Sequence, residues 1–154
     1  MMVECIVSGG QTGVDRAALD AALALGIPCG GWCPSGRRAE DGVLDARYPL
    51  RETPSEDYAE RTEWNVRDSD GTLILCRAQP LTGGTAMTAE FAQRWRKPYH
   101  VVALQAAADV SAARTWVGAQ RIRVLNVAGP RESKAPGIYG EAETWLRALL
   151  GRGA

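Results

Sequence analysis

Short apolar runs alternate along the chain with longer segments in which apolar residues recur at helical spacing. The apolar runs are typical of buried strands, and they cover residues 3–7, 27–32, 71–77, 99–104 and 122–127. The segments with helical spacing predict helices at 14–25, 56–67, 85–96, 109–120 and 139–150. Gly26 is placed to end the first of these helices, and Ser55 is placed to cap the second.

This alternation predicts a single Rossmann-like α/β domain over residues 1–154, with an open, mainly parallel sheet and helices on both faces. Residues 33–50 interrupt the pattern, because they are polar, contain two prolines and two glycines, and show no periodicity. A segment of this length is too long for a simple connector, so we expect a functional loop or lid.

Composition and charge narrow the class of protein. A net charge of zero argues against a nucleic-acid partner. No apolar run approaches the ~20 residues of a membrane helix, and the chain does not open on a secretory signal pattern, so we expect a cytoplasmic protein. Cys5, Cys29, Cys33 and Cys76 are expected as free thiols. With no CxxC pair and one histidine, His100, we predict no metal site.

Two glycine-rich loops follow predicted strands, Ser8–Gly13 (SGGQTG) and Thr82–Thr85 (TGGT). In an open parallel sheet, ligands bind beyond the carboxyl ends of the strands, where helix N-termini present free N–H groups. Glycines let the backbone approach a phosphate, and the serine and threonine hydroxyls add donors. We therefore expect these loops, on adjacent strands, to form one pocket for a phosphate-bearing small molecule, with loops 32–42 and 126–133 at the same edge. The alternative is a pair of tight turns without a ligand.

Charged and aromatic side chains near these loops allow two interpretations each. Arg37, Arg38 and Arg51 would supply positive charge to the pocket, or they are solvated surface residues. Trp32 and Trp64 would stack on a heterocycle, or they pack in the core or at an interface.

Three motifs occur in order along the chain: SGGQTGVDRAALDAALALGIPCGGWCPSGRRAEDG, YAERTEWNVRDSD and TGGT. Together they resemble the molybdenum cofactor carrier family, a Rossmann-like group within the superfamily of lysine-decarboxylase-like, lonely-guy and DprA-type nucleotide-binding domains. The resemblance covers almost the whole chain. The residues that match its motifs are Ser8, Gly9, Gly10, Gln11, Thr12, Gly13, Asp15, Arg16, Pro34, Gly36, Arg37, Glu40, Asp41, Gly83, Gly84 and Thr85.

The resemblance implies a carrier that holds the molybdenum cofactor, a pterin with a phosphate tail, without transforming it. It also implies a homo-oligomer, a dimer or a tetramer. The ligand-binding residues that we predict are Ser8, Gly9, Gly10, Gln11, Thr12, Gly13, Arg16, Pro34, Arg37, Gly83, Gly84 and Thr85. Cys33 is the one loop thiol that would matter for molybdenum.

A second resemblance leads to a competing function. Lonely-guy enzymes hydrolyse the N-glycosidic bond of nucleoside 5′-monophosphates, and their PGGxGTxxE signature aligns with TGGTAMTAE, which keeps both glycines and Glu90. Their catalytic arginine stands nine residues before an aspartate, an interval that Arg61 and Asp70 repeat, although Thr62 replaces the usual lysine. Arg61 would orient the sugar phosphate and Glu90 would polarise water or stabilise oxocarbenium charge. The structural alternative is an ion pair between the two at the surface or at an interface. A nucleotide-sensing or purely oligomeric scaffold domain is a third possible function.

Overall fold

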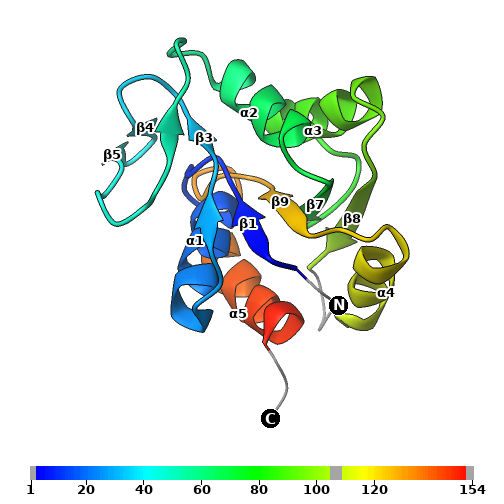
Figure 1. Ribbon diagram of the computed structural model, residues 1–154. Helices are drawn as coiled ribbons and strands as arrows, with labels where there is room; N and C mark the ends of the chain where they lie inside the picture. The colour runs from blue at the N-terminus through cyan, green and yellow to red at the C-terminus, as the bar shows by residue number, and fades with distance from the viewer. Residues whose placement is uncertain (1–2, 105–108, 152–154) are drawn as a thin grey trace.

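A five-stranded parallel sheet forms the centre of the computed structural model, which describes residues 3–104 and 109–151 (Figure 1). The strands lie in the order β2-β1-β9-β7-β8, and each neighbouring pair is parallel. They are β1 (Cys5–Val7), β2 (Cys29–Gly30), β7 (Gly71–Cys76), β8 (Tyr99–Ala103) and β9 (Val124–Ala128). The predicted Rossmann-like fold is confirmed, and each predicted apolar run contributes a strand to this sheet.

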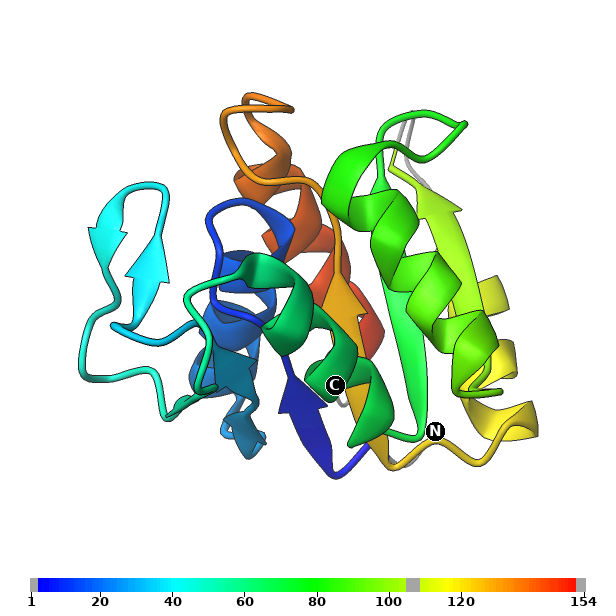
Figure 2. The same ribbon diagram turned by 90° about the horizontal axis from the view of Figure 1, so that it is seen from above.

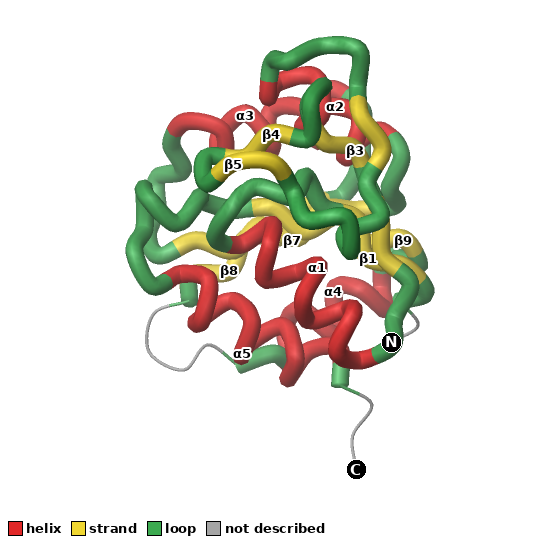
Figure 3. Tube along the Cα trace, turned by 90° about the vertical axis from the view of Figure 1, so that its left-hand side faces the viewer, coloured by secondary structure: helices red, strands yellow, loops and turns green. Residues whose placement is uncertain are grey.

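Helices cover both faces of the sheet, as predicted (Figure 3). One face is covered by α1 (Val14–Leu25), α4 (Ser111–Ala119) and α5 (Ile138–Leu150). The other is covered by α2 (Tyr58–Arg67) and α3 (Gly83–Arg94). None of the helices within the described ranges combines the length and the apolar character that a membrane span requires.

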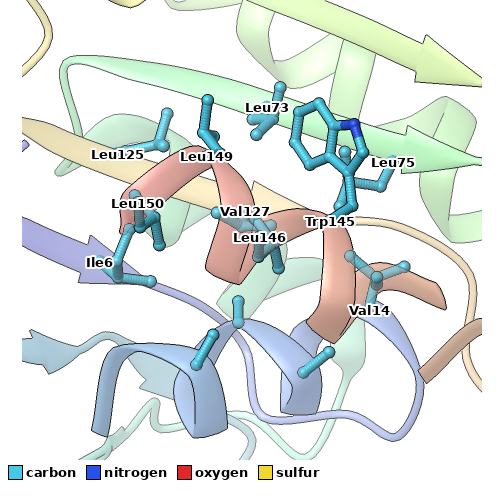
Figure 4. Packing of buried hydrophobic residues seen from close by; sticks show 14 of the residues in the cluster. Ile6, Val14, Leu73, Leu75, Leu125, Val127, Trp145, Leu146, Leu149 and Leu150 are labelled. Atoms are coloured by element: carbon cyan, nitrogen blue, oxygen red, sulfur yellow. The ribbon is translucent and has the colours of Figure 1, made fainter. Parts of the chain in front are cut away.

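The largest core lies between the sheet and the layer of α1 and α5 (Figure 4). Alanines on α1 are fully buried, so the two helices approach closely. Burying each leucine of α5 stabilises the fold by about 1.5–3 kcal/mol relative to leaving it exposed. This layer therefore fixes β1 and β9, whose carboxyl ends carry the candidate site.

The ends of α1 and α2 follow from their capping residues. The first helix ends as predicted, because Gly26 adopts the left-handed conformation with φ 70°. The prediction of a Ser55 cap on the second helix is wrong: Asp57 is the N-cap, and its side chain accepts from the Ala59 amide. Ser55 instead accepts from the Asp57 amide through its hydroxyl, which shapes the turn before the helix.

Residues 33–50 have more regular structure than the sequence indicated. β3 (Trp32–Cys33) pairs with β6 (Arg51–Glu52), and β4 (Arg38–Ala39) forms a hairpin with β5 (Gly42–Val43). The segment has its own small core, packed on α1 and made of Leu19, Cys33, Ala39, Leu44, Tyr48 and Leu50. The sequence did not indicate these short strands or this core, because turns separate the apolar residues and hide their pattern.

Candidate functional site

A cavity of about 620 Å³ lies beyond the carboxyl ends of β1, β9 and β7. Figure 2 shows the loops that follow these strands at the upper edge of the sheet. Four segments line the cavity: the first glycine loop, the first part of α2, the loop from β7 into α3, and the loop from β9 into α5. Both predicted glycine loops therefore reach one cavity.

We expected the two glycine loops to follow adjacent strands, but the strands that precede them, β1 and β7, are not adjacent. Strand β9 lies between β1 and β7, so the β9–α5 loop stands between them and supplies part of the wall. The order of strands along the chain does not reveal this insertion, because β9 is formed near the C-terminus. Of the other loops expected at this edge, 126–133 contributes to the cavity, and 32–42 does not line it.

Several polar groups of the first glycine loop are used inside the protein. The Gly10 amide donates to Ser8 Oγ at 3.4 Å, and the Thr12 amide donates to the Gln11 side chain at 3.0 Å. The Gln11 amide donates to Asp15 Oδ2 at 3.3 Å, and the buried Ser8 hydroxyl donates to the Asp15 carbonyl at 2.8 Å. These groups are not open to a ligand in this structure. Only two residues of the loop line the cavity, Gly9 and Gln11.

The end of the first loop packs against the β9–α5 loop. The Thr12 hydroxyl donates to Glu40 and accepts from the Glu132 amide at 3.1 Å. A Cβ atom on Gly13 would lie 2.3 Å from the Pro130 carbonyl oxygen, so only glycine permits this approach. Thr12 and Gly13 therefore join two walls of the cavity without lining it themselves.

The second glycine loop is open to the cavity, because it forms the first turn of α3. The Ala86 amide is the first to donate within the helix, to the Thr82 carbonyl at 3.2 Å. The amides of Gly83, Gly84 and Thr85 therefore lack helical acceptors, and Thr82 makes no side-chain cap within the described residues. A Cβ atom at either glycine would meet nothing within 4 Å. The first turn carries no acidic residue that would occupy this positive helix end.

Arg61 and Asp15 form a buried pair in the wall of the cavity, each with 7% of its surface exposed. Arg61 Nη1 lies 3.6 Å from Asp15 Oδ2 and donates to the Gly9 carbonyl at 2.7 Å. Burial raises the pKa of Asp15 to about 6, although Arg61 and the Gln11 amide both act to lower it. A side chain at position 9 would displace Arg61, since a Cβ atom there would lie 2.3 Å from Arg61 Nη1.

Basic side chains outnumber acidic ones in the lining, which holds Arg61, Arg77, Arg131 and Lys134 against Asp15 and Asp57. Arg77 pairs with Glu141 at 2.9 Å, and Arg131 lies 3.9 Å from Glu40. Lys134 is exposed and has no ion pair with any described residue. Sequence reasoning did not single out Arg77, Arg131 or Lys134. Their proximity to the strand ends was the available signal.

Two predicted basic residues hold the segment 33–50 together. Arg16 donates to the Gly10 carbonyl at 3.2 Å and forms a two-pronged pair with Asp41 at 3.0 and 3.1 Å. Arg37 donates to three backbone carbonyls within residues 45–50. Neither arginine lines the cavity.

The catalytic pair of the competing function is not brought together. Arg61 lines the cavity and pairs with Asp15, whereas Glu90 is exposed on α3 outside the lining. Three other predicted residues also lie outside the lining: Pro34, which is buried, and Arg38 and Arg51, which are exposed.

The two tryptophans pack against each other outside the cavity lining. Trp32 and Trp64 meet edge to face, with ring centroids 4.8 Å apart. Arg51 lies over Trp32 at 4.2 Å and Arg67 over Trp64 at 4.6 Å. The rings therefore contact each other, partly buried, outside the three hydrophobic core clusters of the described residues.

The four cysteines are free thiols. Cys33 is buried in the core of the segment 33–50, away from the cavity, whereas Cys76 lines it and donates to the Val102 carbonyl at 3.6 Å. Within residues 3–104 and 109–151, no group of three or more His, Cys, Asp or Glu is placed to hold a metal ion.

A parallel sheet with a ligand-sized cavity at its carboxyl edge and an open helix N-terminus in the cavity wall defines a Rossmann-like α/β domain. The chain belongs to the circularly permuted YpsA SLOG family, whose sequence model matches residues 6–150.

A solved structure agrees with this assignment and with the resemblance drawn from the sequence motifs. It is the crystal structure of a "putative molybdenum carrier protein" from Syntrophus aciditrophicus SB, with 46% sequence identity and a TM-score of 0.90. The similarity covers 96% of this chain and 95% of that one. No curated protein shows significant similarity to the chain.

Proposed function

We propose that this protein binds a phosphate-bearing small molecule in the cavity and acts as a carrier of the molybdenum cofactor. The observation that carries the proposal is the open N-terminus of α3 in the cavity wall, where Gly83, Gly84 and Thr85 present amides without helical acceptors. Helix N-termini of this kind bind phosphate through their N–H groups and the helix dipole. The second glycine loop is thus the proposed phosphate site.

The size and charge of the cavity support a cofactor-sized anion. Its volume of about 620 Å³ falls within the roughly 300–1,000 Å³ typical of small-molecule sites. Lys134, which has no ion pair with any described residue, adds positive charge to the lining. The name of the similar protein from Syntrophus supports a molybdenum-containing cargo, and a cavity this large favours the whole cofactor over a single tetrahedral oxyanion.

A substitution at Gly84 tests the phosphate site without threatening the fold. Gly84→Asp would place a carboxylate at the open helix end, where it favours the helix and competes with phosphate. Purified wild-type protein is expected to protect added molybdenum cofactor from loss in air, measured as the cofactor left to reactivate a cofactor-free molybdoenzyme. The Gly84→Asp variant is expected to lose this protection, and Gly84→Ala, whose methyl group meets nothing within 4 Å, is expected to keep it.

Gly84 is chosen for this test because other glycines of the motifs are closely packed against neighbouring residues. Gly10 has φ 78°, and a Cβ atom there would lie 2.6 Å from Leu50 Cδ1, so a substitution would disturb folding. If folded Gly84→Asp protein protects the cofactor as well as wild type does, the start of α3 is not the phosphate site.

The competing function, hydrolysis of nucleoside 5′-monophosphates, is favoured by one observation: Arg61 lines the cavity. Incubation with several nucleoside monophosphates, followed by chromatography for free base, tests it. If the wild-type protein releases free base and Glu90→Gln abolishes this release, the protein is a hydrolase and the carrier proposal is refuted. Nucleotide binding without turnover would instead indicate a sensing domain. The predicted homo-oligomer is tested separately, by light scattering of the purified protein.

A further inference from the structure

We infer that Glu40 is a positioning residue for the cavity, which holds the β9–α5 loop so that Arg131 and Lys134 stand at the cavity wall. The inference deepens the proposed function and rests on it for its effect on ligand binding. Glu40 lies in the turn of the β4–β5 hairpin, outside the cavity lining. It acts through the loop that it holds.

The Glu40 carboxylate accepts hydrogen bonds from two separate loops. From the first glycine loop it accepts a hydrogen bond from the Thr12 hydroxyl. From the β9–α5 loop it accepts the Ser133 amide at 3.1 Å and the Ser133 hydroxyl at 2.5 Å, and Arg131 Nε lies 3.9 Å away. All these partners stand on loops that border the cavity.

The backbone of Glu40 is fixed as well. Its amide donates at 2.8 Å to the side chain of Gln11, a residue that lines the cavity. Burial opposes ionisation of Glu40, but hydrogen bonds from Ser133 and Thr12 outweigh it and lower the pKa of the carboxyl group. The carboxylate is therefore ionised at neutral pH, which strengthens each bond that it accepts.

The loop held in this way carries two of the four basic residues in the lining. Arg131 and Lys134 stand on either side of Ser133, the residue that Glu40 binds. Glu132 lies between them, and its carboxylate accepts hydrogen bonds from the Gly137 and Tyr139 amides at the start of α5. These bonds fix the far end of the loop. Glu40 fixes its middle, and without this contact the two cations would lose their defined position at the cavity.

Limited trypsin digestion tests this role without any ligand, because trypsin cleaves after Arg131 and Lys134. We expect Glu40→Ala to be cut at these two positions at least about tenfold faster than wild type, because the variant loses three hydrogen bonds to a charged group and one such bond alone accounts for about a tenfold effect. Glu40→Gln keeps an acceptor for Ser133 and is expected to restore most of the protection. The matched control is Glu56→Ala, since Glu56 is exposed and its one partner among the described residues is Arg38, at 3.8 Å.

Binding of the molybdenum cofactor supplies the second readout, measured with the protection assay as a function of protein concentration. Half-maximal protection is expected to need about tenfold more Glu40→Ala protein than wild type, with Glu40→Gln close to wild type, both measured at a temperature at which each variant is folded. Equal digestion rates in wild type and Glu40→Ala would overturn the inference whether or not any ligand binds. Faster digestion with unaltered cofactor protection would also overturn it, while leaving the proposed function intact. Faster digestion of Glu40→Ala in a protein whose wild type protects no cofactor would support the loop restraint and refute the proposed function alone.

Discussion

Adding one methyl group at Gly9 should displace the guanidinium group of Arg61 from its buried position. An ideal Cβ atom at this position lies 2.3 Å from Arg61 Nη1 and 2.9 Å from both Cδ and Cζ. The nearest atoms belong to a side chain that is itself buried, so it has little room to move aside. The backbone of Gly9 is not in the left-handed region, and the clash is therefore the main cost of Gly9→Ala.

The expected magnitude follows from the contact that is lost. Moving Arg61 breaks its 2.7 Å hydrogen bond to the Gly9 carbonyl, and a hydrogen bond to a charged group contributes about 1.5–3 kcal/mol. Replacing glycine with alanine recovers about 0.4–1 kcal/mol by restricting the unfolded chain. Gly9→Ala should therefore destabilise the protein by roughly 1–2 kcal/mol, which lowers Tm by about 2–8 °C in a chain of this length.

Thermal unfolding of Gly9→Ala beside Gly84→Ala measures this effect with an internal control. Gly84 lies in the first turn of α3 with nothing within 4 Å of its open face, so alanine there should stabilise the protein by up to about 1 kcal/mol. The two glycine-to-alanine changes are expected to shift Tm in opposite directions. Equal shifts, or a Gly9→Ala protein as stable as wild type, would refute the packing argument.

Two further predictions concern ionisable side chains. Because burial raises the folded-state pKa of Asp15 to about 6 from its ordinary value of 3.8, its contribution to stability is fully present below pH 3.8 and is lost as the pH rises through 6. Over that window the free energy of unfolding of wild type should fall by roughly 2–3 kcal/mol relative to that of Asp15→Asn, measured by urea denaturation at each pH. If the free energies of unfolding of the two proteins change with pH in parallel, the buried-carboxyl account is contradicted. Tyr139→Phe removes a hydroxyl that lies 2.5 Å from Asp20 Oδ2 and 2.8 Å from Glu143 Oε2, and it should cost about 1–3 kcal/mol at neutral pH. The matched control is Tyr58→Phe, which should leave Tm nearly unchanged because the Tyr58 hydroxyl has no hydrogen bond among the described residues.

The pattern of apolar residues was enough to predict the elements that build the central sheet. The helix over 14–25 has the predicted limits, since alanines at helical spacing and Gly26 act locally. The position of β9 between β1 and β7 could not be predicted in the same way, because it depends on packing between distant parts of the chain. The same limit hid the core of residues 33–50, which is completed by Leu19 on α1.

The candidate site was predictable as a location but not in its details. Both glycine loops reach the cavity, as their place after strands implied. The sequence does not show that the Asp15 side chain accepts a hydrogen bond from the Gln11 amide, or that the Ser8 hydroxyl donates to a backbone carbonyl inside the protein. Such internal hydrogen bonds make the two loops unlike: the first is a packed turn, and the second is an open helix end.

A crystal structure of the protein loaded with the molybdenum cofactor would test the central claim most directly. The account predicts the phosphate group of the cofactor within about 3.2 Å of the amide nitrogens of Gly83, Gly84 and Thr85, with the rest of the molecule in the cavity beside Arg61. A phosphate bound elsewhere, with the start of α3 facing only solvent, would contradict it.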